Sequence, residues 1–124
     1  MRAIVLATDG SPSAANATLR AVELARTLGA AVVAVSVEHA AEIGTGHYGY
    51  ADVMSELTNP QAERVEQTLA QAVAIAAEAG VECEPVHRRG RVPTEICRLA
   101  ARRNARMIVI GAHGRGPIRR APSN

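Results

Sequence analysis

The ten residues from Ala3 to Pro12 read AIVLATDGSP and join an apolar run to the start of a helix. A short, continuous apolar run is typical of a strand that is buried on both faces. Ser11 is a preferred N-cap residue, and proline is favoured in the first helical turn. This stretch therefore predicts a buried strand that leads directly into a helix, the unit from which parallel α/β sheets are built.

The remaining sequence repeats this alternation. Short apolar runs predict further strands at residues 31–37, 81–87 and 107–110. Apolar residues at helical spacing predict helices at residues 12–28, at 60–80 and from 93 onward. Strands alternating with helices predict one α/β domain over residues 1–124, a three-layer α/β/α fold with a doubly wound parallel sheet.

Three details refine this prediction. The apolar stripe of the first helix is expected to consist of Leu19, Val22, Ala25 and Leu28. Because proline cannot donate to a strand ladder, Pro85 places the third strand at a sheet edge. Residues 38–58 hold three glycines and both tyrosines without clear periodicity, as expected of a long, functional loop.

The composition excludes several classes of protein. The chain has 124 residues, with 25 alanines and neither Phe nor Trp, so we expect a thin core of Val, Ile, Leu and Ala. No apolar run approaches the roughly 20 residues of a transmembrane helix, and the N-terminus lacks signal-peptide organisation. A cytoplasmic protein with no membrane partner is expected. Cys83 and Cys97 form neither a CxxC motif nor a disulfide framework and are expected to be packing residues.

Charge is divided unevenly along the chain. Residues 1–85 carry four arginines and eleven acidic residues, whereas residues 86–124 carry ten arginines and one acidic residue. There is no lysine, which excludes a Schiff base and a P-loop lysine. The basic part indicates a surface that faces an anion. It has no aromatic residue on which bases would stack, so a nucleic-acid partner is not expected.

The strongest local motif is GAHGRG at residues 111–116. Glycines after a parallel strand let backbone N–H groups approach phosphate oxygens. Arg115, Arg119 and Arg120 would add charge-assisted bonds to phosphate. A tight turn followed by a solvated basic tail explains the same residues, and the motif alone does not separate the two interpretations.

Asp9 and the histidines are the other polar candidates. A carboxylate after the first strand can accept ribose hydroxyls or help to hold a phosphate-bound metal, but Asp before Gly-Ser-Pro is also typical of an Asx turn. Both interpretations of Asp9 remain open. No two histidines have the i, i+4 spacing of a helical metal site, so no metal ligand is predicted. A nucleophile elbow and a first-strand G-x-G-x-x-G are absent from the sequence.

Residues 4–11 (IVLATDGS) and 108–116 (IVIGAHGRG), with Arg89-Gly90 between them, resemble the universal stress protein family. The resemblance extends from Met1 to about Arg120. It implies a sheet in the order 3-2-1-4-5 and, in one branch of the family, binding of ATP or AMP, with Mg²⁺ as a companion of the phosphates. The nucleotide-binding residues that it implies are Asp9 beside the ribose and phosphates, the backbone of Val37 at the adenine, and Gly111 and Gly114 near ribose and phosphate. The chemistry of the glycine-rich loop adds Arg115 and Gly116 to these candidates.

The sequence departs from the family's nucleotide motif, G-x2-G-x9-G-[S/T]. Gly111 and Gly114 fit its first half, but its third glycine falls on Asn124. The resemblance therefore implies a domain that is incomplete at its C-terminus, with strand order 3-2-1-4 and the fifth strand missing from the chain. This incompleteness is either a natural truncation or a shortened form of the protein. Residues 107–110 would then form an exposed apolar edge, which favours association. A homodimer or a higher oligomer is expected.

Three functions remain as hypotheses. The first is a stress-response domain that binds ATP or AMP, with no catalytic residue and at most slow ATP hydrolysis. The second is a dimerising interaction or regulatory module of the same fold that does not bind nucleotide. The third, an enzyme of the wider adenine-nucleotide hydrolase group, is disfavoured because residues 8–13 (TDGSPS) do not supply the phosphate-loop motif S-G-G-x-D-S.

Overall fold

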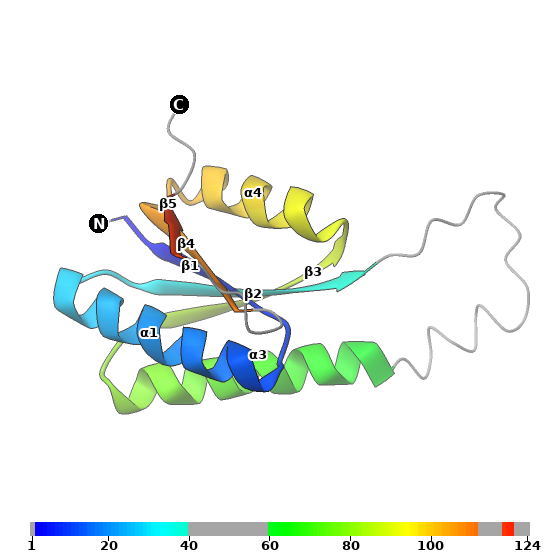
Figure 1. Cartoon of the computed structure of the whole chain (residues 1–124), viewed down its shortest axis with the longest axis horizontal. Coiled ribbons are helices and arrows are strands. Elements are labelled where there is room, and N and C mark those ends of the chain that lie inside the picture. Colours follow the sequence, from blue (N-terminus) through cyan, green and yellow to red (C-terminus); the bar gives the residue numbers. More distant parts are fainter. Residues whose placement is uncertain (1, 40–59, 112–117, 121–124) are drawn as a thin grey trace, which may run out of the picture.

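A computed structural model describes residues 2–39, 60–111 and 118–120 (Figure 1). The strands and helices alternate as the sequence predicts for most of the chain. In chain order they are β1 (Ile4–Thr8), α1 (Pro12–Leu28), β2 (Val32–His39), α3 (Pro60–Glu78), β3 (Cys83–Gly90), α4 (Val92–Arg102), β4 (Met107–Gly111) and β5 (Ile118–Arg120).

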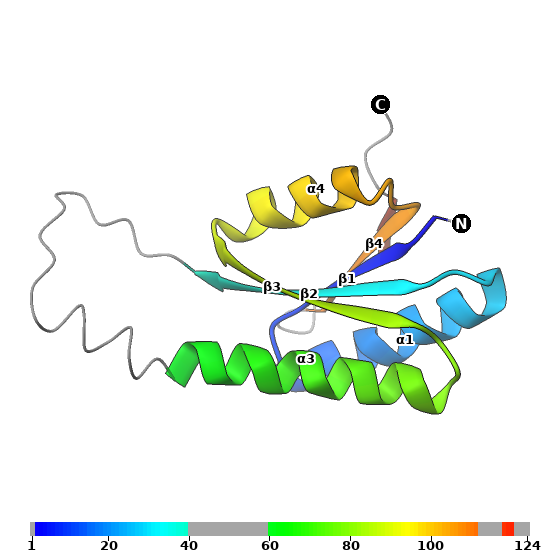
Figure 2. The ribbon, with the colours of Figure 1, turned by 180° about the vertical axis from the view of Figure 1, so that it is seen from behind.

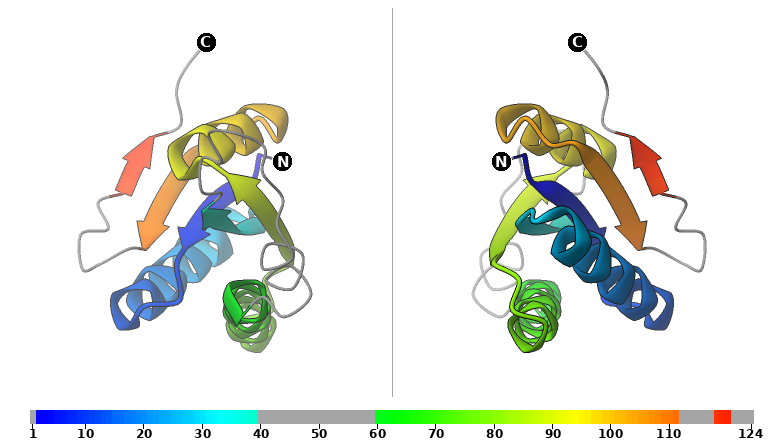
Figure 3. Two further views of the ribbon diagram at one scale, coloured as in Figure 1. Left: turned by 90° about the vertical axis from the view of Figure 1, so that its right-hand side faces the viewer. Right: turned by 90° about the vertical axis from the view of Figure 1, so that its left-hand side faces the viewer.

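The sheet has the order β3-β2-β1-β4-β5, and β1 to β4 are mutually parallel. Helices α1 and α3 cover one face and α4 covers the other, as the end-on views in Figure 3 show. The predicted α/β class and the order 3-2-1-4 are confirmed. β3 with Pro85 lies at a sheet edge, as predicted.

The prediction that residues 107–110 form an uncovered sheet edge is wrong. The three-residue strand β5 pairs with β4 in antiparallel orientation, and Met107, Ile108 and Val109 lie opposite Arg120, Arg119 and Ile118. Only six residues separate β4 from β5. This length suffices for an antiparallel partner, whereas a parallel strand requires a crossover of about a dozen residues or more. The chain was expected to lack its fifth strand, and the structure instead has a short antiparallel strand in that place.

Helix α1 begins and ends at the residues that its sequence marks. The Oγ atom of Ser11 accepts a hydrogen bond from the backbone N–H of Ala14 at 3.3 Å, and Pro12 opens the helix. Gly29 ends it in the left-handed region with a φ of 66°. Such C-cap geometry favours glycine because a Cβ atom would clash there.

The predicted apolar stripe of α1 is only half correct. Leu19 is 54% exposed and Leu28 is 36% exposed. The buried face consists of small residues and one valine: Ala14, Ala17, Thr18, Ala21, Val22 and Ala25. Alanines on this face allow α1 to lie close to the sheet, so the larger leucine side chains fall outside the contact.

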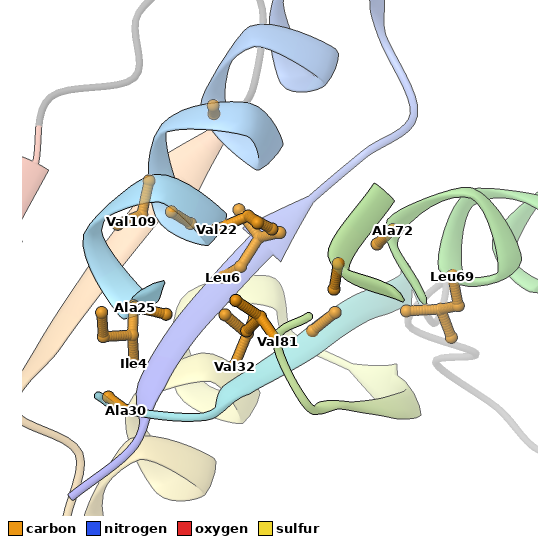
Figure 4. Close-up of a cluster of buried hydrophobic side chains, with 14 of the residues drawn as sticks. Ile4, Leu6, Val22, Ala25, Ala30, Val32, Leu69, Ala72, Val81 and Val109 are labelled. Atoms are coloured by element: carbon orange, nitrogen blue, oxygen red, sulfur yellow. The ribbon is translucent and has the colours of Figure 1, made fainter. Parts of the chain in front are cut away.

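Each face of the sheet has its own hydrophobic cluster, because side chains alternate across a strand. Ile4, Leu6 and Val32 point toward α1 and α3, where Val22 and Leu69 pack against them (Figure 4). Val5 and Val35 point to the opposite face, under Leu99 of α4. The largest side chains of both clusters are aliphatic, as the composition predicts.

The bounds of β3 differ most from the prediction. β3 begins at Cys83 and continues to Gly90, three residues beyond the predicted end at His87. Val81 precedes the strand but is still buried against α1 and α3.

None of the helices within the ranges given above has the length and apolar composition of a membrane span.

Candidate functional site

The candidate site lies at the carboxyl ends of the central strands. Thr8, the last residue of β1, is paired with Gly111, the last residue of β4. The backbone N–H of Asp9 then donates to the carbonyl oxygen of Gly111 at 3.3 Å. From β1 the chain adds β2 and β3 on one side of the sheet, and β4 then joins β1 on its other side. The Asp9–Gly111 contact is therefore at the topological switch point, where doubly wound sheets bind their ligands.

Asp9 forms the turn that starts α1. Its Oδ1 atom accepts a hydrogen bond from the backbone N–H of Ser11 at 2.9 Å. The residue is exposed, and the neighbouring Thr8 Oγ1 accepts from the N–H of Gly10 at 3.3 Å. The Asx-turn interpretation of Asp9 is confirmed. This turn also holds the Asp9 carboxylate at the edge of the sheet. The role of this carboxylate in binding a nucleotide stays a prediction.

Gly10 connects this turn to α3. Its φ is +80°, and a Cβ atom at this position would lie 2.4 Å from the Oγ1 atom of Thr68. Both the left-handed backbone and the closeness of Thr68 therefore require glycine here. The sequence contains the Asp-Gly pair but gives no sign that a residue 58 positions away packs on it.

Gly111 is required by packing. It is buried, and a Cβ atom there would lie 2.8 Å from the Cβ atom of Ala17 and 2.9 Å from the Cα atom of Ala14. The close approach of α1 to β4 thus accounts for this glycine without any ligand. A backbone that approaches phosphate remains compatible with the same residue, because Gly111 is the last residue of β4 and lies at the carboxyl end of the strand.

Val37 lies on β2, the strand beside β1, and Asp9 directly follows β1. The last recorded pair between β1 and β2 is Ala7 with Val35, so Val37 extends two residues beyond it. On its other side it is opposite Arg88 of β3. The half-buried side chain packs on the cluster under α4. The structure thus brings Asp9, Val37 and Gly111 to one edge of the sheet on three adjacent strands.

The remaining predicted residues divide into two groups. Gly114, Arg115 and Gly116 lie outside the described residues. Arg119 and Arg120 are opposite Ile108 and Met107, at the amino end of β4. Their backbones are three and four residues from Gly111 along the strand, about 10–13 Å away. The prediction that these two arginines support phosphate beside Gly111 is therefore not supported by their position.

A cluster of one histidine and two glutamates that the sequence did not predict lies on β2, β3 and α3. His87 of β3 is 2.8 Å from Glu38 of β2 through Nε2 and 2.8 Å from Glu66 of α3 through Nδ1. The side chain of Glu38 is 7% exposed, whereas that of Glu66 is 68% exposed. We call these three residues the His87 cluster. They are 21 and 49 positions apart in the sequence, so no local motif marks them.

The two carboxylates control the protonation of His87. Burial alone lowers the pKa of the imidazole, but hydrogen bonds and charge from Glu38 and Glu66 outweigh it. The pKa of His87 is therefore raised above its ordinary value. Elsewhere, burial raises the pKa of the Cys83 thiol, as expected of an unreactive packing residue. Among the residues that the structure places, no group of three His, Cys, Asp or Glu side chains is arranged to hold a metal ion.

Comparisons with known proteins agree with the fold. The sequence model of the Universal stress protein family matches residues 1–123. A universal stress family protein from Burkholderia pseudomallei is 29% identical, with a TM-score of 0.70, over 90% of this chain and 82% of that one. The universal stress protein from Archaeoglobus fulgidus in complex with dAMP is 28% identical, with a TM-score of 0.62, over 89% and 80%.

A more distant structure supports the fold alone. Universal stress protein UspA from Lactobacillus plantarum is 23% identical, with a TM-score of 0.72, over 93% of this chain and 81% of that one. A search of curated proteins finds no match.

Proposed function

Because the chain belongs to the universal stress protein family, we propose that it binds an adenine nucleotide, ATP or AMP, at the carboxyl ends of β1, β2 and β4. The observation that carries this proposal is the Asp9–Gly111 contact at the topological switch point, with Val37 on the adjacent strand. Parallel α/β sheets bind ligands at this position. The Archaeoglobus relative described with dAMP is similar over most of both chains, which supports an adenine nucleotide.

We assign each residue a role that follows the family resemblance or the chemistry of the glycine-rich loop. The backbone of Val37 would bond the edge of the adenine, and the Asp9 carboxylate would accept ribose hydroxyls. Gly111, with Gly114, Arg115 and Gly116 from the adjoining loop, would face the phosphates, and Mg²⁺ would accompany ATP. Helix α1 also begins beside Asp9, so its N-terminal dipole favours an anion nearby.

We propose binding without efficient catalysis. None of the residues assigned here has the arrangement of a nucleophile with an adjacent base, so any ATP hydrolysis should be slow. A role in a stress response, a cytoplasmic location and assembly as a homodimer or higher oligomer belong to the same proposal. The nucleotide content of freshly purified protein is its most direct test.

Titration calorimetry with AMP and with ATP–Mg²⁺ provides the quantitative test. Asp9→Asn keeps an Oδ1 acceptor for the N–H of Ser11 but removes the charge, whereas Asp9→Ala removes both. We expect Asp9→Asn to weaken binding about tenfold or more, because a hydrogen bond to a charged group contributes about 1.5–3 kcal/mol. A wild-type protein that shows no heat at millimolar nucleotide would refute the proposal.

A non-nucleotide interaction module is the alternative. It is favoured by one observation: Asp9 and Gly111 each have a role in the fold that needs no ligand, the Asx turn and the contact with α1. Under this alternative no nucleotide copurifies. Size-exclusion chromatography with light scattering would still reveal a dimer or a larger species, whereas a stable monomer would contradict both the module and the proposed oligomer.

A further inference from the structure

The His87 cluster connects three elements beside the proposed nucleotide site. Glu38 directly follows Val37 at the carboxyl end of β2, and Glu66 lies in the first half of α3. His87 lies between them on β3, opposite Ser36 of β2. Helix α3 runs along β2 and β3, which Figure 2 shows from behind. The imidazole is therefore a polar link between this helix and the end of β2.

The number of protons on the imidazole decides how many of these links exist. Each ring nitrogen is 2.8 Å from a carboxylate oxygen, and an ionised carboxylate only accepts hydrogen bonds. A neutral imidazole has one N–H, whereas the imidazolium has two. Both contacts are therefore hydrogen bonds only when His87 is charged. Loss of the proton removes one of them.

Burial decides which hydrogen bond is lost. The side chain of Glu38 is 7% exposed, so water cannot readily replace a hydrogen bond that it loses, and that loss is costly. The side chain of Glu66 is 68% exposed and exchanges its partner for water at little cost. Neutral His87 should therefore keep Nε2–H toward Glu38 and release Glu66 together with the first half of α3.

Two other charged residues lie on the elements that form the cluster. Arg89 is two residues along β3, hence on the same face as His87, and is opposite Glu38 in the register. Glu63 is one turn before Glu66 on α3. The raised pKa of His87 comes from Glu38 and Glu66, and neither Arg89 nor Glu63 is among its causes. The two carboxylates of the cluster therefore control its protonation.

We propose that protonation of His87 closes a latch that holds the first half of α3 to the carboxyl end of β2. The latch is closed at mildly acidic pH and opens as the pH rises. A second consequence rests on the proposed function: because Glu38 follows Val37, an open latch leaves the strand end that would bond adenine linked to β3 but no longer, through His87, to α3. Nucleotide affinity should therefore fall when His87 loses its proton.

Hydrogen exchange of the full chain without nucleotide tests the latch itself. Protection factors, which correct for the intrinsic effect of pH on exchange, are measured for α3 at pH 6 and pH 8.5. We expect amides in the first half of α3 to lose about twofold to fivefold protection at the higher pH, as for one exposed ion pair. The non-titrating His87→Gln should show no such difference. The matched control His39→Gln changes an exposed histidine of β2 and should behave as wild type.

Two results would overturn the latch. One is an equal pH dependence of α3 protection in wild type and His87→Gln. The other is a two-dimensional NMR titration in which His87 has the pKa of a free histidine. Glu66→Gln provides a second readout, because it should lower the pKa of His87 while Glu38 remains paired.

Titration with AMP at the same two pH values tests the coupling. The ratio of wild-type to His87→Gln affinity cancels the ionisation of the nucleotide phosphate, and this ratio should fall at pH 8.5. A constant ratio overturns the coupling. If neither protein binds AMP at either pH, the proposed function fails, and the exchange experiment still decides whether the latch exists.

Discussion

The substitution Gly111→Ala tests whether packing of α1 on β4 requires this glycine. The added methyl group would lie 2.8 Å from the Cβ atom of Ala17 and 2.9 Å from the Cα atom of Ala14. Carbon atoms pack best at about 3.5–4.0 Å, so α1 must move outward by about 0.6–1.2 Å along this contact. The contact with Ala14 involves the helix backbone, which no change of rotamer can relieve.

The expected cost follows from these distances. Overpacking of a well-packed core costs about 1–3 kcal/mol. Replacing glycine by alanine also reduces the entropy of the unfolded chain, which returns about 0.4–1 kcal/mol. A net loss of roughly 0.5–2.5 kcal/mol is therefore expected. For a chain of 124 residues, unfolding entropies of about 2.1 cal/mol/K per residue convert this to a decrease in Tm of roughly 2–10 °C.

Urea unfolding followed by circular dichroism measures this loss as a lower midpoint with an unchanged slope. Two controls separate contact from backbone strain. Ala17→Gly combined with Gly111→Ala should show positive coupling of at least about 0.5 kcal/mol, because it removes one of the two close contacts. Gly80→Ala has a φ of +72° and no neighbour within 4 Å, so it measures the cost of a left-handed backbone without a contact, a cost that Gly111 does not carry. A Gly111→Ala protein as stable as wild type would refute the packing argument.

Three further predictions concern other parts of the fold. Ser11→Ala should lower the free energy of unfolding by about 1 kcal/mol, the usual effect of losing an N-cap, and Ser11→Asp should retain most of it in the same urea experiment. Gly10→Ala should cost about 1–2 kcal/mol for its left-handed backbone alone, plus a contact penalty that Thr68→Ala removes, as a double-mutant cycle would show. Since the pKa of His87 is raised by folding, its stabilisation is complete below about pH 6.5 and is lost as pH rises through the folded pKa. The Tm of wild type should therefore approach that of His87→Gln at alkaline pH, and a constant difference between them would contradict this.

Local chemistry made most of the fold predictable. Ser11 and Pro12 mark the start of α1 because an N-cap and its N–H partners lie within three residues of each other. Gly29 marks its end for the same reason. The buried strands β1 and β4 are visible as continuous apolar runs. The prediction of the buried face of α1 failed because burial depends on the neighbouring elements. Leu19 has the helical spacing expected of the apolar stripe, but alanines form the contact between α1 and the sheet.

The candidate site was predictable only in part. Asp9 and Gly111 stood out because each follows an apolar strand, and the sheet order then places these strand ends together. Their contacts with Ser11 and with α1 came from the structure. The positions of Arg119 and Arg120 could not be predicted, because the sequence does not show that the chain returns beside β4 in antiparallel orientation.

By itself, the sequence determined the alternation of strands and helices, their caps and the aliphatic core, since these depend on residues a few positions apart. Only the tertiary structure decided which distant residues meet. Glu38, Glu66 and His87 come from β2, α3 and β3, and no local pattern relates them. Their contact depends on strand register and on the position of α3 over the sheet, which result from packing of the whole domain. A proton-dependent link of this kind can therefore be recognised only once the chain is folded.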